Sequence, residues 1–279
     1  MRRKIRAYLV LPHAWAVLVV VAATAAFGLL AADGRPPAGR FALLLLAMLG
    51  GQLAIGALNE YMDRAADAVA KPWKPIPAGD VSPAAALTVT ALGLLLMLIA
   101  GGLLGLAELA VLSIGIGGGL AYDLGLKRTP VSWLPYLVAL PIVPIWAWMV
   151  MDAFQPRHLW LYPIGALLIV AIHLAQVLPD IEADRERGER GLGVFLGERW
   201  ATVVMWTAAF ASPLIAGAGS VMFGSRPVAG MLAGAVVAGV FATTFVLHRR
   251  APARVGPFLF QILTASAVVL GCGWVVASG

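Results

Sequence analysis

Long apolar stretches recur along the whole of this chain. A helix needs about 20 mainly apolar residues to cross the hydrocarbon core of a bilayer, and nine stretches of roughly that length can be identified. They are 14–32, 41–58, 84–106, 109–126, 133–150, 159–178, 201–223, 228–247 and 258–277. The composition agrees, since 61% of the residues are hydrophobic and only 12% are charged. We therefore expect an all-α, polytopic membrane protein.

Basic residues are divided unevenly between the two sides that nine alternating spans would define. Sixteen of the 20 Lys and Arg residues fall on the side of the N-terminus, and the exceptions are Arg35, Arg40, Arg157 and Arg226. Basic loops favour the cytoplasmic side, so we expect the N-terminus and two longer loops, 63–82 and 180–199, to be cytoplasmic in a bacterial cell membrane. This topology accounts for the net charge of +6 without nucleic acid. No linker divides the sequence, which predicts one transmembrane domain over residues 1–279.

Acidic residues follow two of the apolar stretches. The segment 59–67 reads NEYMDRAAD and is followed by KPWKPIP. Its Asn59, Asp63 and Asp67 are spaced i, i+4, i+8, which places them on one face of a helix. Asp180 and Asp184 repeat the four-residue spacing after a later stretch. The alternative to a shared function is that all of these are simply solvated helix ends.

Converging carboxylates need a positive partner. Two like charges about 4 Å apart repel by about 4 kcal/mol at an effective dielectric constant of roughly 20. Mg²⁺ suits carboxylate ligands together with phosphate oxygens and water, and basic residues lie on the same side, so the pattern predicts a diphosphate ligand. Breaking the C–O bond of a prenyl diphosphate would leave an allylic cation in an apolar pocket.

These motifs resemble those of the UbiA-type intramembrane prenyltransferases. The family motif NDxxDxxxD with KPxRPIPSG is matched by NEYMDRAAD with KPWKPIPAG, and DxxGDxxxG with a later TLPVxLG by DIEADRERG with GLGVFLG. A third motif, a Tyr followed by a Lys, is matched by YDLGLKR. The resemblance implies about nine transmembrane helices around a central cavity. It also implies transfer of a prenyl chain from a prenyl diphosphate to a small, lipophilic acceptor, such as an aromatic compound or a quinone precursor.

The resemblance also implies roles for particular residues. Asn59, Asp63 and Asp67 would bind one Mg²⁺, and Asp180 and Asp184 another. Lys127 would hold the diphosphate, and Tyr122 would line the pocket near the reacting carbon. Further substrate-binding candidates on the same side are Lys71, Lys74 and Arg128, and a purely topological role is the alternative for Lys71 and Lys74.

Other positions depart from the family pattern or have two explanations. Glu60 replaces an Asp and Lys74 replaces an Arg, while Pro179 is expected to end or kink the sixth helix early. His173 lies seven residues before Asp180 and is either an acceptor-binding residue or a histidine in a helix contact. Asp123 either pairs with Lys127, four residues later, or contacts the acceptor.

Two other functions are compatible with the same residues. A terpene cyclase would use the same metals but no acceptor. A secondary transporter would also carry acidic residues in its spans, although more often near the middle of the membrane. We expect contacts with membrane lipids and no obligate protein partner.

Overall fold

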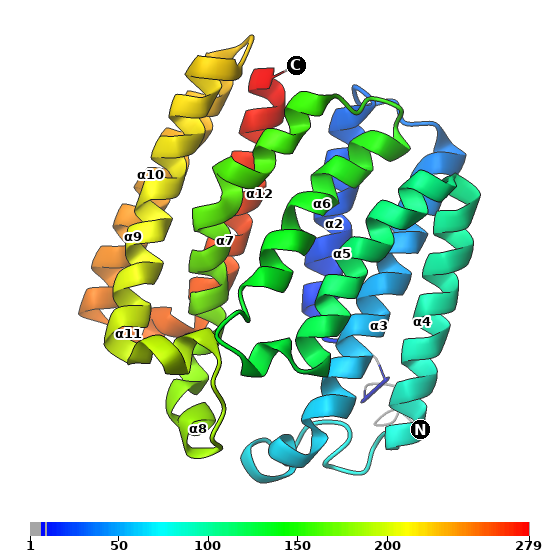
Figure 1. Cartoon of the computed structure of the whole chain (residues 1–279), viewed down its shortest axis with the longest axis vertical. Coiled ribbons are helices and arrows are strands. Elements are labelled where there is room, and N and C mark those ends of the chain that lie inside the picture. The colour runs from blue at the N-terminus through cyan, green and yellow to red at the C-terminus, as the bar shows by residue number, and fades with distance from the viewer. Residues whose placement is uncertain (1–6, 9, 279) are drawn as a thin grey trace. The chain divides into compact units, whose positions relative to one another are not determined.

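The computed structural model describes residues 7–8 and 10–278, and this part of the chain folds into helices without a β-strand (Figure 1). The helices are α2 (Ala14–Ala31), α3 (Ala38–Ala70), α4 (Pro83–Leu104), α5 (Leu106–Leu124), α6 (Leu134–Val150), α7 (Leu161–Val177), α8 (Ile181–Glu186), α9 (Leu192–Phe223), α10 (Pro227–Arg250), α11 (Pro252–Val255) and α12 (Leu259–Ser278). The predicted all-α fold is confirmed. The basic residues Arg2, Arg3, Lys4 and Arg6, which were counted for the orientation, lie outside the described residues.

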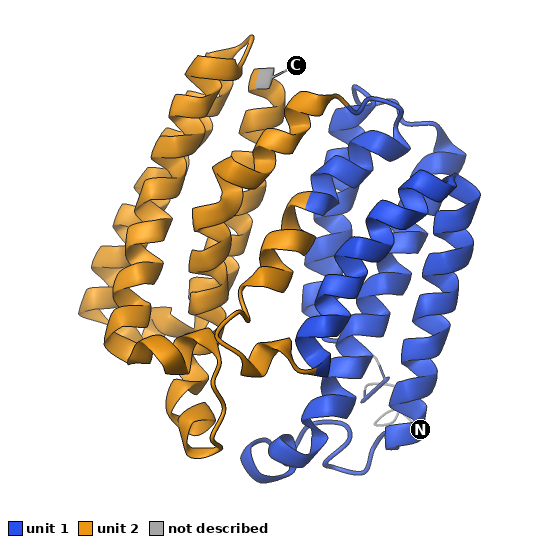
Figure 2. Cartoon of the chain, viewed as in Figure 1, with its two compact units in different colours: residues 1–124, 142–154 blue, residues 125–141, 155–279 orange. Residues whose placement is uncertain are grey.

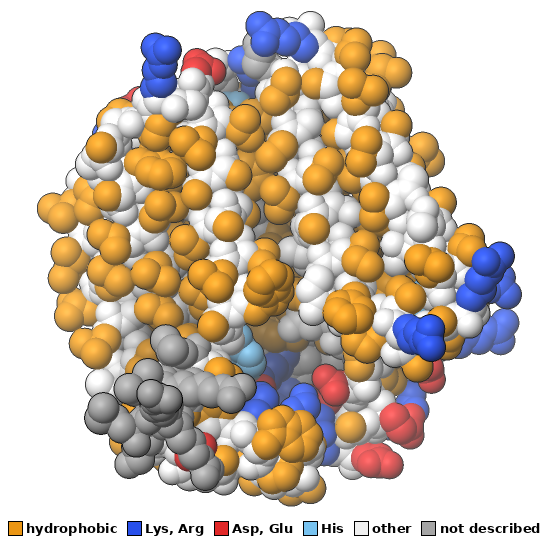
Figure 3. Space-filling view, turned by 180° about the vertical axis from the view of Figure 1, so that it is seen from behind, with side chains coloured by type: hydrophobic (Ala, Val, Ile, Leu, Met, Phe, Trp, Pro, Cys, Tyr) orange, Lys and Arg blue, Asp and Glu red, His pale blue; other side chains and the backbone are white. Residues whose placement is uncertain are grey.

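Each predicted span corresponds to a helix. Within the described residues, eight helical segments are long and apolar enough to cross a membrane. The ninth, α6, has 17 residues, about 25 Å at a rise of 1.5 Å per residue, which is somewhat less than the hydrocarbon thickness. The expected count of nine is therefore close. Hydrophobic side chains are spread over the face drawn in Figure 3, with most Lys, Arg, Asp and Glu side chains near its edges, as contact with lipid requires.

The two predicted cytoplasmic loops are more helical than expected. α3 continues to Ala70, so the first irregular segment begins at Lys71 and not near residue 63. The run of Ala residues favours the helix, whereas Pro72 disfavours a helical conformation at Lys71. In the second loop, α8 and the start of α9 leave residues 187–191 irregular. A kink follows at Gly197, whose φ of 71° interrupts the helical path inside α9. Gly188 has a φ of 73°, which ends the helical path after α8.

The chain forms two compact units, coloured separately in Figure 2. Unit 1 contains Met1–Leu124 and Ile142–Phe154, and unit 2 contains Gly125–Pro141 and Gln155–Gly279. In unit 1, α3 packs against α2, α4 and α5. In unit 2, α9 packs against α7 and α10, and α12 packs against α7 and α10. The first acidic motif therefore belongs to unit 1 and the second to unit 2.

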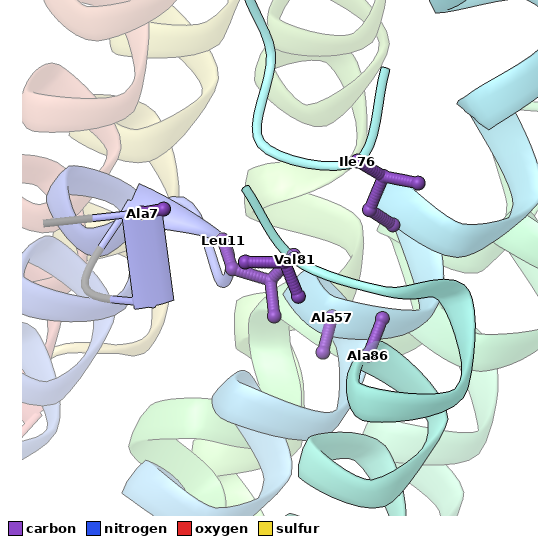
Figure 4. Packing of buried hydrophobic residues seen from close by; sticks show 6 residues of the cluster. All are labelled: Ala7, Leu11, Ala57, Ile76, Val81 and Ala86. Atoms are coloured by element: carbon purple, nitrogen blue, oxygen red, sulfur yellow. The ribbon is translucent and has the colours of Figure 1, made fainter. Parts of the chain in front are cut away.

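An apolar cluster in unit 1 fixes the loop after the first motif. Ile76 and Val81 from this loop are buried with Leu11, Ala57 of α3 and Ala86 of α4 (Figure 4). The alternation of Pro with apolar residues in KPWKPIP restricts the backbone and supplies the side chains that this contact needs. The cluster therefore holds Lys74 close to α3.

Gly56 allows the segment before α2 to approach α3 closely. A Cβ atom at Gly56 would lie 2.3 Å from the carbonyl oxygen of Pro12. We expect Gly56→Ala to lower the free energy of unfolding by about 1–3 kcal/mol, because the clashing atom belongs to the backbone.

Gly39 of the same helix provides the matched control, since nothing lies within 4 Å of a Cβ atom there. Gly39→Ala should leave the stability unchanged or raise it slightly. The two variants are compared by denaturant unfolding in detergent, and equal stabilities would contradict the close contact with Pro12.

Candidate functional site

The first acidic motif lies on the last turns of α3. Because α3 is continuous to Ala70, Asn59, Asp63 and Asp67 follow one another on one helix face, as the spacing predicts. Asn59 and Asp63 are half-buried, and Asp67 is buried. The site in unit 1 therefore presents an amide and two carboxylates along one helix end.

Lys74 reaches back from the following loop to this helix. Its Nζ atom lies 2.6 Å from Glu60 Oε1 and 2.8 Å from Asp67 Oδ2. Burial disfavours the charged form of Lys74, but the hydrogen bonds to Asp67 and Glu60 outweigh it and raise the pKa of Lys74 above its ordinary value of 10.5. One ammonium group thus links two carboxylates that are seven residues apart.

Asp123 of α5 contacts the amide of the motif. Asn59 Nδ2 donates a hydrogen bond of 2.6 Å to Asp123 Oδ1, and Asp123 is only 2% exposed. The sequence suggested either Lys127 or the acceptor as the partner of Asp123. The structure adds Asn59 as a partner. The preceding residue, Tyr122, is half-buried on the same helix.

His13 completes the group, although nothing in the sequence marked it as a candidate. Its Nε2 atom lies 3.1 Å from Asn59 Oδ1 and 3.2 Å from Glu60 Oε1. His13 caps the start of α2 with a left-handed backbone, φ 55° and ψ 59°. No spacing rule could have found it, because the contact joins residues 46 positions apart and depends on the approach at Gly56.

The second motif lies where α7 ends. The α-helix stops at Val177, and residues Leu178–Asp180 form a 3-10 turn that includes Pro179, so the expected early end is confirmed. Asp180 is exposed, while Asp184 is half-buried on α8 and accepts a hydrogen bond from Arg187.

Basic residues surround this motif within unit 2. Glu189 lies between Arg187, at 3.6 Å, and Arg128, at 3.8 Å. The backbone N–H of Arg190 donates to the carbonyl oxygen of Arg128, at 3.2 Å. The segment that contains Lys127 and Arg128 is therefore held beside the loop that follows Asp184. Lys127 is half-buried, and so is Lys71 in unit 1.

His173 takes part in a buried polar contact in unit 2. Its Nε2 atom lies 2.9 Å from Ser132 Oγ, which also accepts a hydrogen bond of 3.1 Å from the backbone N–H of Leu192. His173 is 0% exposed and Ser132 is 1% exposed. This geometry favours the helix-contact role of His173, which positions the start of α9.

We expect Ser132→Ala to lower the free energy of unfolding by about 1–3 kcal/mol, because it removes the acceptor of the part-buried Leu192 N–H and a polar contact of the fully buried His173 ring. Thr202 offers a control, since its exposed hydroxyl donates to the backbone carbonyl of Glu198 in its own helix. Thr202→Ala should change the stability by less than about 0.5 kcal/mol. Chemical denaturation in detergent measures both, and an equal effect would argue against the Ser132 contact.

The donor set of the first motif suits Mg²⁺, although no preformed cage is present. Within the described residues, no group of three or more His, Cys, Asp and Glu side chains lies close enough to hold a metal ion. The motif nevertheless offers only oxygen donors on successive turns, which is the chemistry that Mg²⁺ prefers. The Glu60 Oε2 atom is also buried, with no hydrogen-bond partner in the described structure. The residues present therefore fit a divalent cation bound together with substrate oxygens.

Comparisons with known proteins identify related sequences. The sequence profile of the UbiA prenyltransferase family matches residues 18–272. The bacteriochlorophyll synthase 33 kDa chain of Cereibacter sphaeroides is 30% identical over 226 residues, covering 76% of this chain and 74% of the relative. Protoheme IX farnesyltransferase of Acidiphilium cryptum is 34% identical over 168 residues, covering 52% of each chain.

A solved structure shares the fold. It is a UbiA homologue from Archaeoglobus fulgidus bound to GPP and Mg²⁺, which matches with a TM-score of 0.76 at 17% identity. The match covers 98% of this chain and 100% of the other. At this identity the likeness concerns the fold alone.

Proposed function

This chain belongs to the UbiA prenyltransferase family, and from that premise we propose that it transfers a prenyl chain from a prenyl diphosphate to a small aromatic or quinone-precursor acceptor, with Mg²⁺ as cofactor. It is a multi-pass intramembrane prenyltransferase, and our proposal concerns the identity of its substrates and its cofactor. The A. fulgidus homologue was solved with GPP and Mg²⁺, which supports this choice of donor and metal.

The observation that carries the proposal is the arrangement on α3. Asn59, Asp63 and Asp67 share one face, and Lys74 contacts Asp67 directly. Carboxylates beside a lysine are suited to a magnesium diphosphate, because the metal needs the oxygens and the phosphate needs the positive charge. We assign Asn59, Asp63 and Asp67 to one Mg²⁺, and Lys71 and Lys74 to the diphosphate.

The second motif receives the corresponding assignment in unit 2. Asp180 and Asp184 would bind a second Mg²⁺, and Lys127 and Arg128 would contact the diphosphate. The hydrogen bond from Arg190 to Arg128 keeps this basic segment next to the motif loop. Tyr122 would stabilise the allylic cation with its ring face, and His173 would act through Ser132 without contacting substrate.

The chemistry follows from these assignments. Bound Mg²⁺ would neutralise charge that develops on the leaving group. The C–O bond breaks and the diphosphate leaves with the bonding electron pair, while the lysines of the site bind its oxygens. The acceptor then forms a bond to the allylic carbon and loses a proton, which the released diphosphate can take up. An apolar surrounding would protect the allylic cation from water.

Product analysis tests the proposal. The purified protein is given prenyl diphosphates of several lengths with Mg²⁺ and candidate acceptors: aromatic acids, quinone precursors and tetrapyrroles. We expect diphosphate release and a prenylated adduct by mass spectrometry, and both should disappear when EDTA removes the metal. A bare hydrocarbon or alcohol would indicate cyclisation. The absence of any Mg²⁺-dependent diphosphate release would contradict both enzymatic functions.

We also propose that the N-terminus and both motifs face the cytoplasm of a bacterial cell. The uneven division of Lys and Arg residues supports this orientation. Labelling of single cysteines introduced at exposed positions such as Trp73, in a background without Cys272, would report the side directly in intact cells.

A further inference from the structure

We propose that His13 is a positioning residue for the first motif: its imidazole fixes the Asn59 amide and the Glu60 carboxylate, and through Glu60 it holds Lys74. This inference rests on the proposed function, because it assigns His13 to the site that binds the magnesium diphosphate. His13 would act through these three residues, with no contact to the reacting atoms.

Close contacts of the two preceding residues fix the position of His13. Pro12 lies directly against Gly56, where a side chain would clash, and Leu11 is fully buried in the cluster with Ala57. Gly56 precedes Asn59 and Glu60 by about one helical turn, so a residue following Pro12 lies over both. His13 contacts both with a positive φ of 55°, a conformation that is uncommon for residues other than glycine but is adopted more readily by Asn, Asp and His than by most others.

The hydrogen bonds determine the orientation of the Asn59 amide. Its nitrogen donates to Asp123 Oδ1 at 2.6 Å, which leaves its oxygen toward His13. His13 Nε2 faces two acceptors, Asn59 Oδ1 and Glu60 Oε1, so this nitrogen carries the proton and donates. The amide therefore has its two ends fixed by two different residues. Its oxygen, the atom assigned to the metal, cannot exchange places with the nitrogen.

Glu60 connects His13 to Lys74. The Oε1 atom is shared by His13, at 3.2 Å, and Lys74, at 2.6 Å, inside a side chain that is 3% exposed. Lys74 in turn contacts Asp67. A continuous path of polar contacts thus runs from Asp123 through Asn59, His13, Glu60 and Lys74 to Asp67. His13 is the member that joins the amide part of this path to the carboxylate part.

Two substitutions of His13 distinguish a role of its side chain from a role of its backbone conformation. Asn tolerates a positive φ well, but its amide is too short to reach Asn59 and Glu60. Gln tolerates that conformation less well, but its Nε2 group extends about as far as the histidine Nε2 and donates hydrogen bonds. A positioning role predicts that His13→Gln retains function better than His13→Asn. A purely conformational role predicts the reverse order.

The first measurement is steady-state kinetics with the full-length protein in detergent. We expect His13→Asn to lower kcat/KM for the prenyl diphosphate by about 10–100-fold and to raise the Mg²⁺ concentration for half-maximal rate, the usual size of effects from residues that orient metal ligands. His13→Gln should recover most of this loss. Equal kinetics for wild type and His13→Asn would overturn the inference, as would a larger loss in His13→Gln than in His13→Asn.

The second measurement does not depend on turnover. Inorganic diphosphate with Mg²⁺ should raise the unfolding temperature of wild type and of His13→Gln, and should raise that of His13→Asn much less. An equal rise in all three proteins would overturn the inference. A wild-type protein that shows no Mg²⁺-dependent diphosphate release with any prenyl diphosphate would instead overturn the proposed function, and this inference with it.

Discussion

Asp63→Asn and Asp184→Asn should each lower Mg²⁺-dependent diphosphate release by roughly 10²–10³-fold, the effect typical of removing one preorganised group that stabilises the transition state. Each change removes a charge and keeps the shape of the side chain. Both aspartates are half-buried near helix ends, so the variants should remain folded in detergent. Coupled detection of released diphosphate measures the rate, and size-exclusion chromatography verifies the fold.

Glu182 provides the matched control for Asp184. It lies two residues away on α8, its side chain is 73% exposed, and it pairs with Arg185. Glu182→Gln removes the same charge from the same short helix and should change the rate by less than about twofold, since exposed ion pairs contribute little. Near-normal release by Asp63→Asn or Asp184→Asn would contradict the metal assignment of that motif.

Lys74→Met should destabilise the protein by about 3 kcal/mol, because it leaves the carboxylates of Glu60 and Asp67 without their shared cation. Both acceptors are largely buried, with side chains 3% and 8% exposed. Lys74→Arg should keep the ion pairs and most of the stability. Lys71→Met, in the same loop, removes a charge that makes no ion pair with Glu60 or Asp67 in the described structure and should cost little. Denaturant unfolding in detergent compares the three variants with wild type.

The pH dependence of this contribution has a definite sign. The pKa of Lys74 is raised in the folded protein, so the contribution is fully present below the ordinary lysine pKa of 10.5. It is lost as the pH rises through the raised value. The stability difference between wild type and Lys74→Met should therefore be constant near neutral pH and shrink only in the strongly alkaline range. A difference that disappears near neutral pH would contradict the ion-pair account.

The sequence predicted the helices well because a bilayer requires long apolar stretches whatever the tertiary structure. It also placed Asn59, Asp63 and Asp67 on one helix face from spacing alone. The predicted end of α3 was less accurate, because the residues after Asp63 are polar enough for a loop and yet continue the helix to Ala70. The sequence signal for the true end is Pro72, which disfavours a helical conformation at Lys71.

The partners of the site residues were not predictable in the same way. Lys74 was identified as a substrate-binding candidate, but its contact with Glu60 depends on how the loop is held by Ile76 and Val81. Asp123 contacts Asn59 because α5 packs against α3, a pairing that spacing cannot show. His13 was missed because a single histidine before an apolar stretch carries no sequence signal for its contact with Asn59, 46 residues away.

Calorimetric titration of inorganic diphosphate, with and without Mg²⁺, tests most directly the claim that the acidic motifs bind a magnesium diphosphate. Wild type should bind diphosphate only when Mg²⁺ is present, and Asp67→Asn and Asp184→Asn should each weaken that binding by about 10–100-fold. Diphosphate binding that is independent of Mg²⁺, or that is unchanged when both aspartates are replaced together, would contradict it.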